Sequence, residues 1–208
     1  MKQKTADKFI RLYNDFSEDT CWNRAEKSAK HLLSSIAFKE CSTKYYKSSG
    51  SVLLSPIGYY YSIFHMSMTL CWLNPEIAEI KLSKIRHSTL QNFVKGNFVN
   101  QGLLGDSYSN LMQELKEERE WLNYSFGEYQ YDFFENAEEN EKLLNKEFKQ
   151  SVLLMDDICS LLRPKFDIKQ RIKTYIADSK GEDLLQTYLS NSEQDIVTNA
   201  IVNIGYSN

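Results

Sequence analysis

The sequence predicts an all-α protein, and three observations indicate this fold class. The chain of 208 residues contains 8 glycines and 3 prolines, so residues that break helices or form turns are scarce. Hydrophobic residues make up 42% of the chain and charged residues 25%, which is typical of a folded globular protein. Apolar side chains recur every three or four residues, which is the spacing of one helix face. We therefore expect a single bundle built from a few long helices.

The first two predicted helices cover residues 1–16 and 17–39. In the first, Phe9 and Tyr13 lie one helical turn apart. The second carries an apolar stripe on one face, formed by Ala25, Ala29, Leu32, Leu33 and Ile36. Residues 41–51 are rich in serine, lysine and tyrosine, so we interpret them as a loop.

The central helix of the bundle is predicted between Ser55 and Leu73. Serine can cap a helix, and proline is tolerated at its start, so Ser55-Pro56 is a strong start signal. The segment that follows is apolar on nearly every face, which is typical of a helix buried on all sides. Asn74-Pro75 ends it, because the residue before a proline is disfavoured in a helix.

The middle of the chain is predicted to contain shorter and more polar elements. Residues 76–82 could form a short turn of helix, and residues 89–98 are amphipathic. Residues 108–124 form a charged helix. We place three of its glutamates on the outer face, namely Glu114, Glu117 and Glu118. Residues 125–133 are aromatic and irregular, and we expect no regular structure there.

The longest regular pattern covers residues 135–162, and Pro164 closes this helix. Its apolar face is formed by Leu144, Phe148, Val152, Met155, Cys159 and Leu162. From residue 166 onward, two or three shorter helices end in a loose tip. We therefore divide the chain into a leader helix at 1–16, a helical bundle at 17–162 and a C-terminal helical extension at 163–208.

Composition also limits the compartment and the ligands. The chain starts without the apolar core of a signal peptide, and no apolar run approaches the roughly 20 residues of a membrane span. The four cysteines lie far apart, without a C-x-x-C pair, at Cys21, Cys41, Cys71 and Cys159. We expect a cytoplasmic protein with reduced thiols and no membrane contact. The three histidines do not pair with cysteines at zinc-ligand spacing, so no metal or cofactor is expected.

The charge balance limits how the protein could bind nucleic acid. Lys and Arg together number 25 and Asp and Glu 28, which gives a net charge of −3. Such a chain has no bulk attraction for a polyanion, so a nucleic-acid site would have to be local. A modest basic patch could contact RNA or a nucleotide, although a solvated surface is the commoner reason for such a patch, and it consists of Lys81, Lys84, Arg86 and Lys95. We place the binding residues at Lys84, Arg86 and Lys95.

Five segments occur in an order that is similar to a known helical family. They are G-Y-Y-Y-S-I-F-H at 58–65, R-H-S-T-L at 86–90, N-F-V-N-Q-G-L-L at 97–104, E-R-E-W-L-N-Y at 118–124, and F-x-x-A-E-E-x-x-x-L-x-x-x-E-F at 134–148. With these segments the chain resembles a HEPN domain, most of all the small bacterial HEPN-like proteins often found beside nucleotidyltransferases. The resemblance implies a four- or five-helix bundle, here with extra N- and C-terminal helices, and a homodimer.

Many HEPN domains are metal-independent ribonucleases, and the resemblance also implies where such a site would lie. The family motif pairs an arginine, which can stabilise charge on the scissile phosphate, with a histidine that moves the proton. The aligned arginine here is Arg119, and Tyr124 takes the place of the histidine. Tyrosine titrates near pH 10 in model peptides, so it is a poor base at neutral pH and the motif is degenerate. His87 is the nearby residue that could replace the histidine.

Other patterns allow alternative interpretations. Arg24 and His31 also have the arginine–histidine spacing of the motif, but they fall in the wrong helix, and we treat this as chance. His65 on an apolar helix is more often a hydrogen-bonded core residue than a catalyst. The Tyr59–Tyr61 run is more often core packing than a platform for stacking bases.

Three functions remain open from the sequence. The favoured one is a HEPN-like dimeric interaction module that binds RNA, a nucleotide or a protein partner encoded in the same operon, in a bacterial defence or toxin–antitoxin system. The first alternative is a metal-independent endoribonuclease toxin that uses Arg119 and a histidine. The second alternative is a purely structural helical subunit. Apolar residues of the tail could provide a surface for a protein partner, namely Ile196, Val197, Ile201 and Ile204.

Overall fold

The computed structural model describes residues 1–49, 55–124 and 133–207. This part of the chain is built from α-helices and one short π-helical segment, and it contains no β-strand. The predicted all-α fold class is therefore confirmed. None of the helices in the described ranges is both long enough and apolar enough to cross a membrane.

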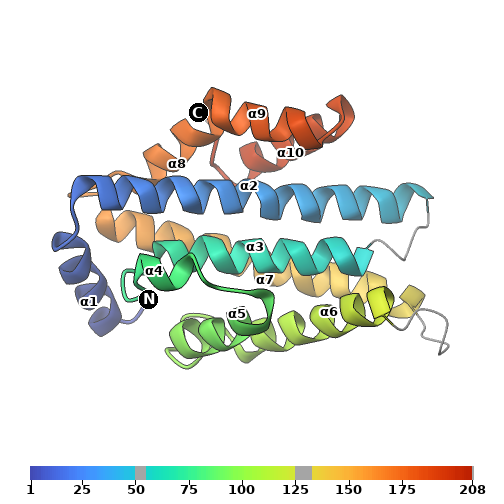
Figure 1. The fold of residues 1–208 in the computed structure, drawn as a ribbon, viewed down its shortest axis with the longest axis horizontal. Coiled ribbons are helices and arrows are strands. Elements are labelled where there is room, and N and C mark those ends of the chain that lie inside the picture. The colour runs from blue at the N-terminus through green and yellow to red at the C-terminus, as the bar shows by residue number, and fades with distance from the viewer. Residues whose placement is uncertain (50–54, 125–132, 208) are drawn as a thin grey trace.

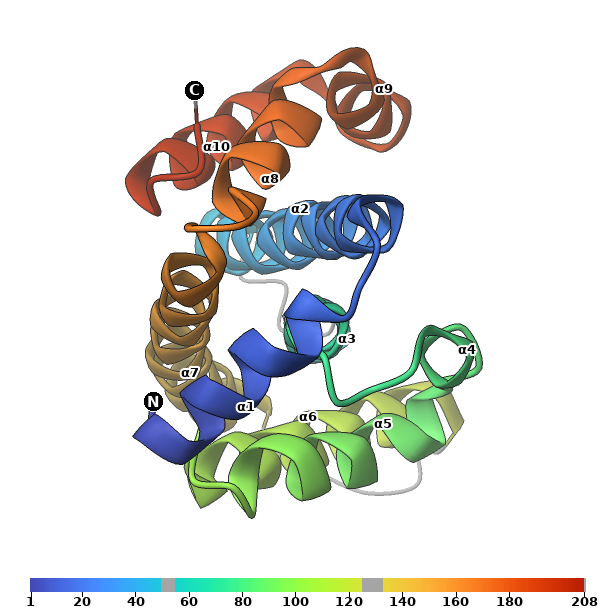
Figure 2. The ribbon, with the colours of Figure 1, turned by 90° about the vertical axis from the view of Figure 1, so that its left-hand side faces the viewer.

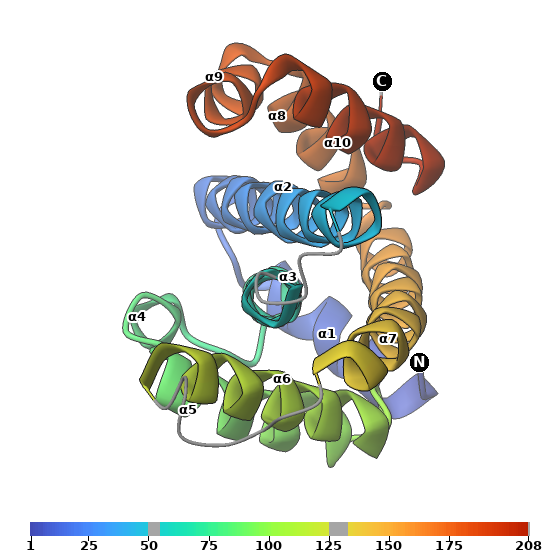
Figure 3. The same ribbon diagram turned by 90° about the vertical axis from the view of Figure 1, so that its right-hand side faces the viewer.

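Four long helices form the framework of the bundle. They are α2 (Glu18–Ser49), α3 (Ser55–Leu73), α6 (Asp106–Tyr124) and α7 (Phe133–Leu162). Figure 1 shows α2 and α3 running side by side along the molecule. In the two end views, α3 lies in the middle, with α2, α7 and α6 around it (Figures 2 and 3). The helix with no polar face is therefore the centre of the fold.

The central helix begins and ends where the sequence predicts. Most of its side chains are buried, including several hydroxyl groups. The helix tolerates these polar groups because they find partners: Ser67 donates to the Ile63 carbonyl at 2.8 Å, and Ser35 of α2 donates to the Ser62 carbonyl at 2.8 Å. After Leu73 the chain turns, and the Asn74 side chain accepts a hydrogen bond from the Glu76 amide at 2.9 Å.

Arg24 of α2 holds the carboxyl end of α3. It is 2% exposed, and one of its terminal nitrogens donates to the carbonyls of Trp72 and Asn74, both at 3.1 Å. The other donates to the Ile77 carbonyl at 2.7 Å. The last carbonyls of a helix have no partner within the helix, so a buried guanidinium here satisfies several acceptors at once. Arg24 is therefore structural, and its spacing to His31 is not a catalytic motif.

The shorter helices complete the bundle on two sides. These elements are α1 (Gln3–Asn14), α4 (Glu79–Leu82), α5 (His87–Val94), the π-helical segment Lys95–Val99, α8 (Ile168–Ala177), α9 (Ser179–Tyr188) and α10 (Asn191–Asn203). Helices α4 and α5 lie on the α6 side of α3, whereas α8, α9 and α10 cover the opposite side of α2 (Figures 2 and 3). Buried residues of α1, α8 and α10 belong to the same core cluster as those of α3.

The structure corrects the prediction of a loop after Cys41. Helix α2 continues to Ser49, because its last turns have partners in distant parts of the chain. Tyr45 donates to Glu193 of α10 at 2.6 Å, and Lys44 donates to Ser192 at 3.0 Å. Tertiary contacts here override a polar composition that by itself favours a loop. The rest of that predicted loop, and residues 125–132 of the predicted irregular segment, lie outside the described residues.

Two further expectations are wrong. Glu118 does not lie on the outer face of α6, because it is 6% exposed and accepts hydrogen bonds from Asn140 of α7 at 3.0 and 2.9 Å. The chain does not end in a loose tip either. Tyr206 is fully buried, and its hydroxyl donates to Asp156 of α7 at 2.8 Å.

Candidate functional site

All three histidines of the chain meet on one side of the bundle, among partly exposed aromatic rings. They come from three helices: His31 from α2, His65 from α3 and His87 from the start of α5. We call this group the histidine–aromatic cluster, and its members are His31, Phe38, Tyr60, Tyr61, Phe64, His65, His87 and Arg119. All three histidines stay partly exposed, and they lie among several aromatic rings and an arginine, so the cluster is the candidate site.

The first half of the cluster joins α2 to α3. The Nδ1 atoms of His31 and His65 lie 2.9 Å apart, so one imidazole donates to the other. Phe38 lies two turns after His31 on α2, and its ring is nearly parallel to the His65 ring, with centroids 5.6 Å apart and an angle of 6°. Phe38 also stacks on Tyr61 at 5.1 Å, which continues the row of rings along α3.

The second half surrounds His87, the first residue of α5. Its Nδ1 atom lies 2.9 Å from the Tyr60 hydroxyl oxygen. The imidazole stacks on Phe64 with centroids 4.1 Å apart, and Tyr61 presents its edge at 5.6 Å. These contacts hold the imidazole plane, while the residue as a whole remains partly exposed.

Arg119 of α6 joins this half of the cluster. Its guanidinium carbon lies 5.0 Å from the centroid of the Tyr60 ring and 5.5 Å from that of Tyr61. These distances are typical of cation–π contacts. Among the described residues, no carboxylate lies within ion-pair distance of Arg119, and its Nε atom is buried without a hydrogen-bond partner. Arg119 therefore forms no ion pair with a glutamate one turn away in this part of the chain.

The cluster keeps its histidines neutral at pH 7. Burial, together with the neighbouring His65, lowers the pKa of His31 to about 3. Burial and the neighbouring His87 lower the pKa of His65 to about 4. Burial, and then the positive charge of Arg119, lower the pKa of His87 as well. The Tyr60 hydroxyl also stays protonated, because burial raises its pKa more than the charge of Arg119 lowers it.

Of the residues predicted for the site, the structure brings His87 and Arg119 together on the same two tyrosine rings. Tyr124 is the last residue of α6, and its side chain lies outside the described part of the structure. Arg86 immediately precedes His87, and Lys84 lies in the turn before it. Lys95 begins the π-helical segment that follows α5. Lys84, Arg86 and Lys95 are exposed, and none forms an ion pair with another described residue.

A cavity opens beside the cluster. Its volume is about 810 Å³, and Phe38 forms part of its wall. The other walls come from α2, the start of α3 and α9, including Lys30, Ser34 and Leu185. Volumes of this size are typical of sites that hold a small molecule or part of a larger ligand.

The comparisons with known proteins do not identify this site. No protein-family model, no curated protein and no solved structure matches the chain. We therefore infer the function from the chemistry of the cluster itself.

That chemistry is suited to an aromatic or anionic ligand. Within residues 1–49, 55–124 and 133–207, no group of three or more His, Cys, Asp or Glu side chains is arranged to hold a metal. A guanidinium with no carboxylate partner can bind a phosphate. Partly exposed Phe and Tyr rings can stack on a base. A neutral imidazole can donate one hydrogen bond and accept another, because one of its nitrogens carries a proton and the other does not.

Sequence interpretation missed the pairing of His31 with His65. It placed His65 in the core and His31 in a chance motif, and the two residues lie 34 positions apart. His65 is hydrogen-bonded, as expected for a core histidine, but it remains partly exposed. A usable signal was present: the chain has only 3 histidines, and two of them lie on consecutive predicted helices.

Proposed function

We propose that the chain is a HEPN-like dimeric interaction module that binds single-stranded RNA or a nucleotide through the histidine–aromatic cluster. The observation that carries this proposal is the meeting of Arg119 and His87 on the rings of Tyr60 and Tyr61. A cation for phosphate and accessible rings for stacking are the elements of single-strand recognition, and here Tyr61 and Phe38 are the accessible rings. The imidazole adds a hydrogen-bonding group.

Each group has a distinct part in binding. Arg119 attracts a phosphate, and its charge is available because no described carboxylate neutralises it. Phe38 and Tyr61 stack on each other and stay partly exposed, so a base can continue the stack. Lys84 and Arg86 lie next to His87 in the chain and add local positive charge to a protein of net charge −3.

The geometry favours binding over cleavage. We infer that the Tyr60 hydroxyl donates to Nδ1 of His87, which lies 2.9 Å away, because the positive charge of Arg119 favours a hydroxyl whose proton is directed away from the guanidinium. The neutral imidazole then carries its own proton on Nε2, so it presents a donor to a ligand rather than a free base. A donor beside a guanidinium holds a phosphate but does not deprotonate a 2′-hydroxyl.

The dimer and the cellular role rest on the resemblance of residues 58–162 to HEPN domains. A homodimer would bring two clusters into one assembly, and an operon-encoded protein would be a second partner. The proposed setting is a bacterial defence or toxin–antitoxin system. Size-exclusion chromatography with light scattering tests the dimer directly, since a mass of one chain at all concentrations contradicts it.

The binding proposal is tested by fluorescence anisotropy with a labelled single-stranded RNA oligonucleotide at low salt. The variants are Arg119→Gln and Phe38→Ala, and Arg163→Gln at the exposed end of α7 is the matched control. Arg119→Gln is expected to weaken binding at least 10-fold, and Phe38→Ala about 5-fold or more, by loss of a stacking surface. Equal affinity of the wild type and Arg119→Gln contradicts the proposal.

A metal-independent endoribonuclease is the second candidate, favoured by the closeness of His87 to Arg119. In this alternative, His87 has a free Nε2 that accepts the 2′-hydroxyl proton, and the 2′-oxygen attacks the phosphorus to form a 2′,3′-cyclic phosphate. The bond to the 5′-oxygen breaks, that oxygen takes a proton from water, and Arg119 stabilises the developing charge on the phosphate. The test is expression of the wild type, Arg119→Ala and His87→Gln in bacteria, followed by growth and RNA integrity. Toxicity and RNA cleavage that both variants abolish support the enzyme. Equal, harmless behaviour of all three excludes it.

A further inference from the structure

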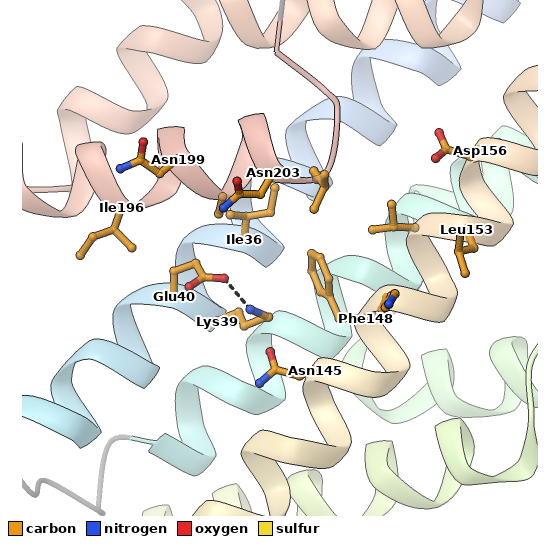
Figure 4. Close-up of a pocket in the computed structure, with 14 residues that line it drawn as sticks. Ile36, Lys39, Glu40, Asn145, Phe148, Leu153, Asp156, Ile196, Asn199 and Asn203 are labelled. Atoms are coloured by element: carbon orange, nitrogen blue, oxygen red, sulfur yellow. Dashed lines mark hydrogen bonds and ion pairs between the residues drawn. The ribbon is translucent and has the colours of Figure 1, made fainter.

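A second hollow lies on another side of the bundle, where α10 faces α7 across α2 (Figure 4). Its volume is about 650 Å³. The apolar part of the lining comes from all three helices and includes Ile36, Phe148, Val152, Ile196 and Ile204. None of these residues belongs to the histidine–aromatic cluster, so the hollow is a separate feature.

Three asparagine side chains surround this apolar floor. Asn145 projects from α7, and Asn199 and Asn203 project from α10 one turn apart (Figure 4). None of the three carboxamides forms a hydrogen bond with another described residue, although each has two donor protons and an acceptor oxygen. All three residues are exposed, so the edge of the hollow offers carboxamide donors and acceptors that no other described residue occupies, beside partly buried apolar side chains.

The charges around the hollow are mostly neutralised within the protein. Lys39 forms an ion pair with Glu40, drawn as a dashed line in Figure 4, and its ammonium also lies 5.3 Å from the centroid of the Phe148 ring. Asp156 accepts hydrogen bonds from Lys169 and Tyr206. The exception is Lys149 at the rim, which is exposed and forms no ion pair with any described residue.

We propose that this hollow binds an adenine nucleotide, with the base between α7 and α10 and the phosphate at Lys149. A carboxamide places its oxygen and its amino group side by side, which matches the N6 amino group and N7 atom of adenine. Apolar side chains on both sides can hold a flat ring. Because the interior is neutral, it disfavours a ring that carries a charge. The single free ammonium at the rim then binds the phosphate.

The proposal is tested by isothermal titration calorimetry with adenosine 5′-monophosphate, adenosine and ribose 5-phosphate. The monophosphate is expected to bind several-fold more tightly than adenosine, and ribose 5-phosphate is expected not to bind. The double variant Asn199→Leu and Asn203→Leu is expected to weaken binding of both adenine ligands at least 10-fold, because each lost hydrogen bond accounts for about a 2- to 10-fold change. Thr198→Leu, on the same helix but away from the hollow, is the matched control.

A second variant separates the base from the phosphate. Lys149→Gln is expected to remove the advantage of the monophosphate over adenosine and to leave adenosine binding unchanged. Circular dichroism checks that each variant keeps its helical content. No binding at millimolar ligand, or equal affinity of the wild type and the double asparagine variant, overturns the proposal.

Nucleotide binding in the hollow is independent of RNA binding at the histidine–aromatic cluster. Arg119→Gln is expected to leave the affinity for adenosine 5′-monophosphate unchanged, and the double asparagine variant is expected to leave RNA binding unchanged. If Arg119→Gln abolishes nucleotide binding while the asparagine variant preserves it, the ligand binds at the cluster. That outcome supports the first proposal and overturns this one.

Discussion

The hydroxyl oxygen of Tyr60 lies 2.9 Å from Nδ1 of His87, and the guanidinium of Arg119 lies over the same tyrosine ring. The positive charge of Arg119 also lowers the pKa of His87. The consequence is a measurable coupling between two residues that come from different helices, α5 and α6.

Replacing Arg119 should raise the pKa of His87. The folded protein lowers this pKa first by burial and then by the positive charge of Arg119. Arg119→Gln removes the second cause, so the pKa should rise while staying below its usual value of about 6.5 because the burial remains. NMR titration of the imidazole C–H signals measures this, with His87→Gln for assignment and Arg163→Gln as control. An unchanged or lower pKa in Arg119→Gln contradicts the coupling.

The His31–His65 pair should make the protein sensitive to mild acid. Their pKa values in the folded protein are about 3 and about 4, against about 6.5 in an unfolded chain. Between these values the unfolded chain binds protons that the folded one does not, so the free energy of unfolding falls as pH is lowered from about 6.5 to about 4. Urea unfolding at pH 7 and pH 5 measures the loss. The double variant His31→Gln and His65→Gln should lose less stability over this range, and an equal loss would show that the pair is not responsible.

Replacement of Arg24 should be strongly destabilising. Arg24→Met leaves three buried carbonyl acceptors without their donor, and each hydrogen bond from a charged group contributes about 1.5–3 kcal/mol. We expect a loss of about 3 kcal/mol or more in the free energy of unfolding, measured with urea. Arg11→Met, at an exposed position of α1, should change it by less than about 0.5 kcal/mol. Similar losses in both variants would refute the anchoring role.

A methyl group at Gly58 should disturb the contact between α2 and α3. A Cβ atom there would lie 1.6 Å from the Ser42 hydroxyl oxygen and 2.7 Å from the Ser42 Cβ atom. Gly58→Ala should therefore cost about 1–3 kcal/mol, as overpacking in a core does. Gly96→Ala, where a Cβ atom meets nothing within 4 Å, should be neutral or stabilising. The penalty should shrink in a Ser42→Gly background, and an undiminished penalty would point to another cause.

Local signals in the sequence were sufficient for the central helix and insufficient for the end of α2. Ser55-Pro56 and Asn74-Pro75 are strong start and stop signals, and α3 has the predicted bounds. The last turns of α2 are polar, and they are helical because Tyr45 and Lys44 bond to α10, more than 140 residues later. No local pattern contains that information. Glu118 was misplaced for the same reason, since its partner Asn140 lies on another helix.

The candidate site was predicted only in part. His87 and Arg119 were considered together because of a family resemblance, and the structure places both against Tyr60 and Tyr61. The His31–His65 contact depends on how far α2 is displaced along α3, which hydrophobic periodicity does not determine. Periodicity identifies the face of a helix that is buried, but it does not identify the residue opposite on the neighbouring helix.

The hydrogen bonds of Arg24 to the end of α3, together with those of Ser28 and Ser35 to carbonyls of α3, fix that displacement. Arg24 and His31 lie on the same helix, separated by about 10 Å along its axis at about 1.5 Å per residue. Together these hydrogen bonds set the axial position of α2 against α3, in which His31 lies opposite His65. A slip of one turn, about 5.4 Å, would separate the imidazoles and move Phe38 away from Tyr61. Arg24 lies outside the histidine–aromatic cluster, yet it helps to keep the rings of α2 aligned with those of α3.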